Sequence, residues 1–216
     1  SAAEAADSAE NLIVAVVDAA QTEAVLFGAA GAAETLPRNA CVLLCPTIAP
    51  ADTERIAGRL AARGLACLDA PMSGGPARAR AGTMSLMVAG DDALVASRSD
   101  LLVAMASTVF RIGRRVGDGA RTKLVNNLLA AINLAGAAEA LALAARAGLD
   151  PAITLAVIEQ SSGQSWIGSE RLRRALSGDL APRAHMTLLA KDAQLAVALA
   201  REVDADAALG AVAITR

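Results

Sequence analysis

Aromatic residues are almost absent from this 216-residue sequence, which has two phenylalanines, one tryptophan and no tyrosine. Hydrophobic residues still make up 55% of the chain, so alanine, leucine and valine supply most of its apolar side chains. Small aliphatic side chains of this kind suit helices that pack closely together. A chain of this length can bury a sizeable core, and we expect two packed units rather than an array of modules.

The sequence also lacks the residue sets of most metal sites and hydrolytic triads. His185 is its single histidine, and no G-x-S-x-G motif is present, so we expect neither a histidine-based metal site nor a serine hydrolase. Its cysteines, Cys41, Cys45 and Cys67, are odd in number, lack C-x-x-C spacing and fall in apolar runs. We expect them to pack in the core rather than to form a disulfide or bind a metal.

No excess of charge of one sign is present. The chain has 20 basic and 22 acidic residues and a formal net charge of −2, which gives no electrostatic footprint for nucleic acid or an anionic membrane. A small-molecule partner fits this balance better. No N-terminal stretch combines basic residues, an apolar run and a small-residue cleavage site, so we expect a protein of the reducing cytoplasm.

One apolar run, residues 128–145, approaches the length of a membrane span. Asn133 and Glu139 lie well inside it, and each would be costly in lipid. The run therefore predicts a helix that is buried by protein, and no membrane partner.

The first half of the chain alternates short apolar runs with helical patterns at residues 20–27 and 51–63. This alternation is typical of a parallel sheet with crossover helices. The expected strands are residues 11–17, 41–45, 65–70, 84–90 and 107–112.

The second half has long apolar or amphipathic stretches and no strand pattern. Gly148 suits the end of a helix, and Pro151 suits the first turn of the next one. The expected helices are residues 118–148, 151–161, 166–176 and 186–202. We therefore predict an α/β fold in which a partial Rossmann-like parallel sheet, residues 1–114, precedes an all-helical domain, residues 115–216.

A nucleotide-binding sheet normally opens with a strand, a G-x-G-x-x-G turn and a helix whose N-terminus holds the pyrophosphate. No such turn precedes residue 11, and the glycines of residues 113–119 follow the last expected strand rather than the first. We expect this sequence to lack the cofactor-binding N-terminal segment of such a sheet. The 216 residues by themselves are then expected to bind a cofactor weakly.

The segment DAPMSGG follows an apolar run and is expected at the carboxyl edge of the sheet, where open α/β folds bind their ligands. Ser73 supplies a hydroxyl, and Gly74 and Gly75 let backbone amides approach a ligand, a combination suited to a carboxylate. An ordinary turn is the alternative.

Lys123 and Asn127 lie four residues apart near the start of a predicted helix, so they share one helix face. A partly desolvated lysine can give a proton to a carbonyl oxygen during hydride transfer, and the asparagine can hold the substrate. An exposed lysine beside a solvent-facing asparagine is the alternative. Lys191 and Asp192, by themselves, predict only a solvated helix face.

Taken in order, several separated motifs resemble those of the β-hydroxyacid dehydrogenase family, of the 3-hydroxyisobutyrate, tartronate semialdehyde and L-threonate type. The segment CPTIAP is similar to its cofactor-contacting turn, and DAPMSGGPARARAGTMSLMVAG to its substrate loop and following strand. The segment GRRVGDGARTKLVNN is similar to its lysine signature, and SSGQSW and PRAHMTLLAKDAQLA to its C-terminal helical region. The resemblance spans nearly the whole chain.

The resemblance implies an oxidoreductase that transfers hydride between NAD or NADP and a small 3-hydroxy acid, either a four-carbon sugar acid or a compound like 3-hydroxyisobutyrate. Lys123 matches the catalytic acid/base, while Asn127 and residues 73–75 match substrate contacts. Thr47 and Lys191 match cofactor contacts. The protein is expected to be a homodimer or homotetramer.

The run from Pro182 to Asp192 is more similar to dehydrogenases of L-threonate and related four-carbon acids, but it lacks the family's usual aromatic residue near Ala184 and acidic residue near Thr187. Relatives also begin with a glycine-rich turn and extend beyond residue 216. A second hypothesis therefore stays open at this point, a non-catalytic remnant whose alanine-rich helices serve as an oligomerisation module.

Overall fold

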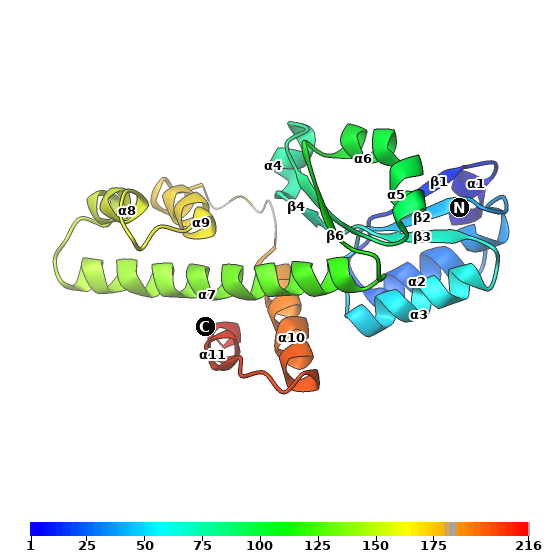
Figure 1. The fold of residues 1–216 in the computed structure, drawn as a ribbon. Helices are drawn as coiled ribbons and strands as arrows, with labels where there is room; N and C mark the ends of the chain where they lie inside the picture. Colours follow the sequence, from blue (N-terminus) through cyan, green and yellow to red (C-terminus); the bar gives the residue numbers. More distant parts are fainter. Residues whose placement is uncertain (180, 182–184, 216) are drawn as a thin grey trace. The chain divides into compact units, whose positions relative to one another are not determined.

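The structure is a computed structural model that describes residues 1–179, 181 and 185–215 (Figure 1). The chain divides into two compact units, Ser1–Val125 and Asn126–Arg216. The division falls within one continuous helix, α7 (Asp118–Arg146). The first unit contains the sheet, and the described part of the second unit is helical.

The sheet of the first unit has six strands, in the order β1-β2-β3-β5-β4, with β6 on β5 as well. The strands are β1 (Asn11–Val14), β2 (Cys41–Leu44), β3 (Ala66–Asp69), β4 (Met72–Ser73), β5 (Ser85–Ala89) and β6 (Thr108–Gly113). The pairs β1·β2, β2·β3 and β5·β6 are parallel, which confirms the predicted α/β class. The sheet is nevertheless mixed, because β5 runs antiparallel to both β3 and β4.

Strand β2 lies between β1 and β3, is buried along its whole length and sends alternate side chains to the two faces of the sheet. Val42 and Leu44 pack in one apolar cluster with Leu60, whereas Leu43 packs in another with Leu102. Helices α2 (Ala19–Phe27) and α3 (Pro50–Ala61) supply the first cluster, and α5 (Asp92–Ser97) and α6 (Ser99–Met105) supply the second, on the opposite face (Figure 1). The three cysteines are free, and burial raises the pKa of the Cys45 thiol to about 12.

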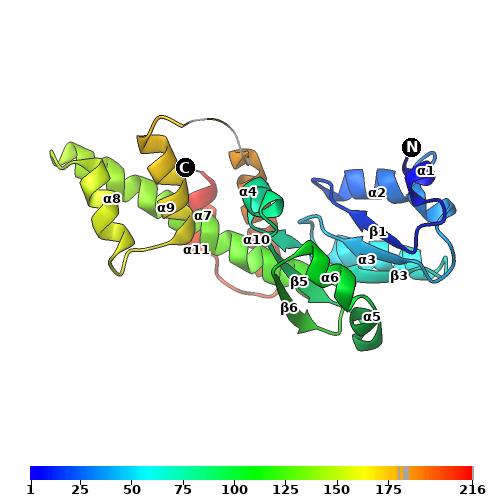
Figure 2. The same cartoon turned by 90° about the horizontal axis from the view of Figure 1, so that it is seen from above.

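In the second unit, α7 is accompanied by shorter helices (Figure 2). These are α8 (Pro151–Glu159), α9 (Trp166–Leu176), α10 (Met186–Glu202) and α11 (Ala208–Ile214). Small residues let α9 and α11 approach α7 closely: a Cβ added to Gly210 would lie 2.3 Å from Leu128, and one added to Gly168 would lie 3.0 Å from Ala137. Glycine at these two positions thus allows close contacts of α9 and α11 with α7.

By length and composition alone, α7 is long and apolar enough to cross a membrane. We expected residues 128–145 to be buried by protein, yet only 22% of the most apolar 18-residue window is buried within the described residues. The expectation is therefore wrong for the single chain. Leu129 and Leu143 stay exposed along it.

Candidate functional site

The carboxyl end of β3 holds the start of α7 through a buried carboxylate. Asp69 is 1% exposed, and its Oδ2 accepts hydrogen bonds from the backbone N–H groups of Gly117 and Ala120, each at 2.9 Å. These N–H groups lie at the opening of the helix, where no intrahelical carbonyl is available to them. Burial raises the pKa of Asp69 from 3.8 to about 6, although bonds from Ala120, Gly117 and Gly119 lower it. The neighbouring carboxylate of Asp118 adds to the rise.

Gly119 permits this close approach of strand and helix. A Cβ at this position would lie 2.9 Å from Asp69 Oδ2 and 2.6 Å from the carbonyl oxygen of Met87 in β5. Only a residue without a Cβ fits against both atoms without a shift of the backbone. The glycines that follow the last strand therefore serve the packing of α7 on the sheet.

The predicted substrate turn follows directly from β3. Ser73 ends β4 and pairs with Ser85 of β5, so its backbone is fixed to the sheet. Gly74 and Gly75 have φ angles of 133° and 64°, which favour glycine, and they open the short helix α4 (Gly75–Arg80). Ser73 and Gly74 are half-buried and Gly75 is exposed, so a small ligand has access to this turn.

Lys123 lies on the second turn of α7, three residues after Ala120, and is only 7% exposed. The alternative of a solvent-exposed lysine is therefore wrong. Burial of an ammonium group is costly unless it is paired, so a lysine buried at this place is a candidate functional residue. Lys123, Asp69 and the Ser73–Gly75 turn all belong to the first unit.

In the second unit, Asn127 forms the centre of a polar group on α7 and α10. Its Nδ2 donates to Asp192 Oδ2 at 2.7 Å, and its Oδ1 accepts from Asn126 Nδ2 at 3.0 Å. Lys191 Nζ lies 2.7 Å from Asp192 Oδ1. The structure thus brings Asn127 and Lys191 to the same carboxylate.

The expectation that Lys191 and Asp192 form a solvated helix face is wrong for Asp192, which is 7% exposed. The residue lies on the buried stripe of α10 with Ala193, Ala196 and Val197. The helical spacing of the sequence could have indicated this burial, since Asp192 precedes the buried Ala196 by four residues and so shares its helix face. The adjacent opposite charges of Lys191 and Asp192 favoured a solvated face instead.

Thr47 lies half-buried in the turn between β2 and α3, at the carboxyl end of the parallel strands. Among the described residues, no side chain caps α3, whose first N–H groups follow Ala49. Backbone amides at such a sheet edge suit the oxygens of a nucleotide, so this turn fits one part of a dinucleotide. Residues 182–184, where the family pattern has an aromatic side chain, lie outside the described residues.

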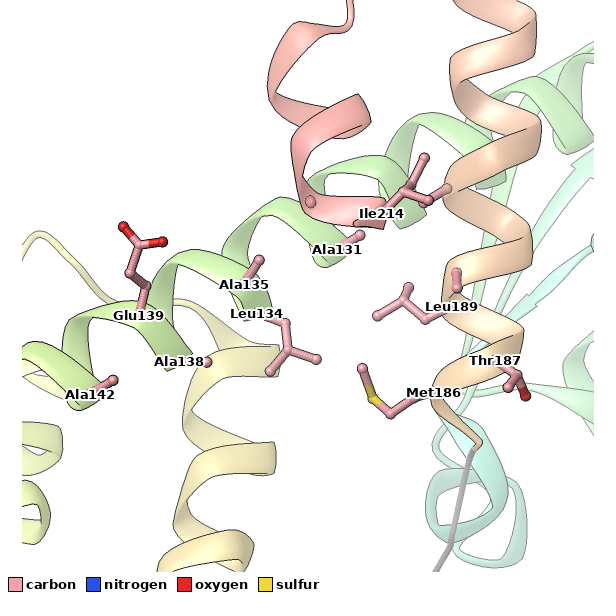
Figure 3. Close-up of a pocket in the computed structure, with 13 residues that line it drawn as sticks. Ala131, Leu134, Ala135, Ala138, Glu139, Ala142, Met186, Thr187, Leu189 and Ile214 are labelled. Carbon is pink, nitrogen blue, oxygen red and sulfur yellow. The ribbon is translucent and has the colours of Figure 1, made fainter. Parts of the chain in front are cut away.

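A cavity of about 710 Å³ lies within the second unit, lined by α7, α10 and α11 (Figure 3). Its lining is almost wholly apolar, and its two polar side chains, Glu139 and Thr187, point away from each other in Figure 3. Ligand sites usually place a few converging polar groups in an apolar wall. This cavity lacks them and does not include any predicted site residue, so we do not assign the chemistry to it.

A sheet with helices on both faces, followed by a long helix that leads into a helical unit, is typical of two-domain dinucleotide-binding dehydrogenases. Family models agree with this class. Residues 1–113 match the NAD binding domain of 6-phosphogluconate dehydrogenase, and residues 117–215 match a model described as NAD-binding of NADP-dependent 3-hydroxyisobutyrate dehydrogenase.

Individual relatives narrow the class. The L-threonate dehydrogenase of Cupriavidus necator is 40% identical over 201 residues, which are 93% of this chain and 68% of the relative. The 3-hydroxyisobutyrate dehydrogenase of Pseudomonas aeruginosa is 36% identical over 220 residues, covering 99% of this chain and 74% of that protein. A crystal structure of 3-hydroxyisobutyrate dehydrogenase from Salmonella typhimurium superposes with a TM-score of 0.92 at 36% identity, over all of this chain and 75% of that one.

The chain therefore belongs to the β-hydroxyacid dehydrogenase family, whose members use NAD or NADP. It spans 60 to 68% of the length of five L-threonate dehydrogenases that it matches. The family and the cofactor class inferred from the sequence motifs are thus confirmed. The roles of the individual site residues, and the domain boundary at residues 114 and 115, stay predictions.

Proposed function

We propose that this protein oxidises or forms a small 3-hydroxy acid with NAD or NADP, and that Lys123 is the acid/base. The observation that supports the proposal most strongly is the burial of Lys123 on the second turn of α7, directly after the turn that Asp69 holds. A buried lysine in a fixed place can hold its proton at one substrate atom, which a mobile surface lysine cannot do.

The roles of the other residues follow from their chemistry. The Ser73 hydroxyl and the amides of Gly74 and Gly75 would bind the substrate carboxylate. In the reductive direction, Lys123 would give its proton to the carbonyl oxygen, and in the oxidative direction it would take the hydroxyl proton back. When bound, NAD or NADP supplies or accepts the hydride. Asn127, one helical turn after Lys123, would hold a substrate oxygen.

Cofactor contacts are proposed at two places. Thr47 would donate its hydroxyl to a ribose or phosphate oxygen at the carboxyl end of β2. Lys191 would contact the nicotinamide half, with Asp192 holding its ammonium group in place at 2.7 Å.

For the substrate, we favour a four-carbon sugar acid over 3-hydroxyisobutyrate. Relatives named L-threonate dehydrogenase are 37 to 40% identical, against 34 to 36% for those named 3-hydroxyisobutyrate dehydrogenase. The difference is small, so both acids belong in the test.

The purified protein should be assayed with L-threonate and with 3-hydroxyisobutyrate, each with NAD and NADP, and with glycerol as a control that has hydroxyls but no carboxylate. We expect reduction of the cofactor with at least one acid and none with glycerol. Fluorescence titration with NADH and NADPH measures cofactor binding separately. Because weak cofactor binding is expected, the titration extends to about millimolar cofactor. Turnover with neither acid, together with no saturable binding up to that concentration, would favour the oligomerisation remnant instead.

We also infer a homo-oligomer, a homodimer or homotetramer, in the cytoplasm. The support for association is the exposed apolar surface of the second unit. It includes Leu143, Ile153 and Trp166, which are 71%, 66% and 61% exposed. Large apolar side chains that stay exposed on one unit often mark a surface that meets another protein.

A further inference from the structure

We propose that Asp69 is a positioning residue that fixes the place of Lys123 relative to the Ser73–Gly75 turn. The inference rests on the proposed function, because it concerns the acid/base group of that reaction. Asp69 lies four residues before Ser73 in the chain, while its side chain binds the helix that contains Lys123. One residue therefore joins the two parts of the first unit that would meet the substrate.

On the helix side, two N–H groups at different angles around the axis of α7 point to one oxygen of Asp69. Gly117 precedes the helix and Ala120 lies in its first turn, so the carboxylate fixes both the height and the rotation of the helix start. Lys123 follows Ala120 by three residues, about 4.5 Å along the axis. Because a helix transmits displacement along its hydrogen-bonded backbone, a movement of the first turn reaches Lys123.

On the side of the turn, the chain from Asp69 to Ser73 is held against β5. Asp69 pairs with Ala89, and the N–H of Met87 donates to the carbonyl oxygen of Pro71 at 3.0 Å. Ser73 then pairs with Ser85. The turn therefore has little freedom to move relative to the strand end that Asp69 occupies.

Met87 of β5 contacts both the segment that leads to the Ser73–Gly75 turn and the start of α7. Its N–H binds the segment that leads to the turn, while its carbonyl oxygen faces Gly119 of α7, where a Cβ would lie at 2.6 Å. The same Cβ would lie 2.9 Å from Asp69 Oδ2. A methyl group at position 119 would thus push the helix start away from both atoms.

A purely structural role for Asp69 is the competing explanation. Asparagine or serine can also accept hydrogen bonds at a helix start. Ionised aspartate is costly here, since burial raises its pKa to about 6 against the effect of three backbone N–H groups. Stability alone therefore gives no reason for a carboxylate at this place, whereas a positioning role explains why its Oδ2 binds two backbone N–H groups at the start of α7.

The first test reads the position of Lys123 without any enzymatic assay. The sequence has only two lysines, Lys123 and Lys191, so protein labelled with ¹³C-lysine gives two sets of Cε signals, which a Lys191→Arg variant assigns. Two variants displace the helix start: Asp69→Ala removes the acceptor, and Gly119→Ala adds the obstructing methyl group. Gly136→Ala is the matched control on the same helix, since its Cβ would meet nothing within 4 Å.

We expect the Lys123 signal to shift or broaden in Asp69→Ala and Gly119→Ala, with the Lys191 signal unchanged and both signals unchanged in Gly136→Ala. An unmoved Lys123 signal in Gly119→Ala overturns the proposal. Gly119→Ala also decides the question if Asp69→Ala does not fold. This measurement stands even if the unaltered protein shows no turnover, an outcome that would contradict the proposed function alone.

The second test uses activity. We expect kcat to fall roughly 10- to 100-fold in Asp69→Ala and Gly119→Ala, because a displacement of about 1 Å has an effect of that size. KM for the acid and the Kd for the cofactor should stay close to those of the unaltered protein. Asp69→Asn should restore most of kcat, since its carbonyl oxygen can accept both N–H groups. Equal kcat in Asp69→Ala and the unaltered protein would overturn the proposal.

Discussion

At the scale of single residues, two buried carboxylates form the hydrogen bonds that hold the predicted site residues of α7 in place. Asp69 binds the backbone at the start of α7, and Asp192 binds the side chain of Asn127. Buried charges need hydrogen-bonding partners, and both residues have them. Each carboxylate thereby orders a segment that contains a predicted site residue.

Ionisation of Asp69 should make stability depend on pH. Its pKa is about 6 in the folded protein and near 3.8 when unfolded, so between these values the folded state binds more protons than the unfolded state. The contribution of Asp69 to stability is therefore complete below pH 3.8 and is lost as the pH rises to about 6. The loss corresponds to roughly 2 to 3 kcal/mol in the free energy of unfolding.

Urea unfolding of the unaltered protein and of Asp69→Asn, measured from pH 4 to pH 7, checks this prediction. The difference between the two free energies should change with pH in the stated direction, because the substituted residue does not titrate. A constant difference across the range would contradict the raised pKa.

Sequence patterns indicated Lys123, Asn127 and the Ser73–Gly75 turn, but not the two carboxylates. The bond from Gly117 to Asp69 joins residues 48 apart, and that from Asn127 to Asp192 joins residues 65 apart. No local spacing rule predicts such pairs, because they depend on how the helices pack. Motif resemblance located the candidate site, and tertiary structure was needed to show what holds it.

At the scale of helices and strands, local signals predicted the longer elements well. The boundary between α7 and α8 has Gly148 at φ 76° and Pro151 in the first turn, as the sequence predicts. The short helices α4, α5 and α6 were not predicted, because six or seven residues are too few for a clear helical period. Strand β4 was also missed, since two residues show no alternation.

Helix α8 offers a test of capping. The Asp150 carboxylate accepts from the N–H groups of Ala152 at 2.7 Å and Ile153 at 3.2 Å. Asp150→Ala should lower the free energy of unfolding by about 1 kcal/mol, and Asp150→Ser should recover most of it, because serine is also a good N-cap. Equal stability of the alanine and serine variants in urea unfolding would contradict this role.

At the scale of the whole chain, composition and alternation predicted a sheet unit followed by a helical unit, but neither the antiparallel β5 nor the exposure of α7. The direction of β5 depends on the turn of the chain through β4 and α4, and the two residues of β4 show no alternation that would predict it. The exposure of α7 depends on how much of its surface the neighbouring helices contact, and an apolar composition does not show this.

Association should be visible in solution. Sedimentation equilibrium at about 50 µM chain should give a mass at least twice that of one chain. Leu143→Glu should weaken this association, because it places a charge on the exposed apolar surface of the second unit. Val103→Glu is the matched control, since Val103 is 70% exposed but lies in the first unit, and Leu143 is 71% exposed. A monomer at this concentration would contradict the proposed homo-oligomer.

The role of Lys123 is the central claim, and steady-state kinetics of Lys123→Ala and Lys123→Arg test it most directly. General acid/base catalysis contributes about 10²- to 10⁴-fold, so kcat should fall by that factor in both variants, since arginine keeps the charge but does not release a proton. The Kd for NADH or NADPH should stay within about twofold. Turnover in Lys123→Ala equal to that of the unaltered protein would contradict the account.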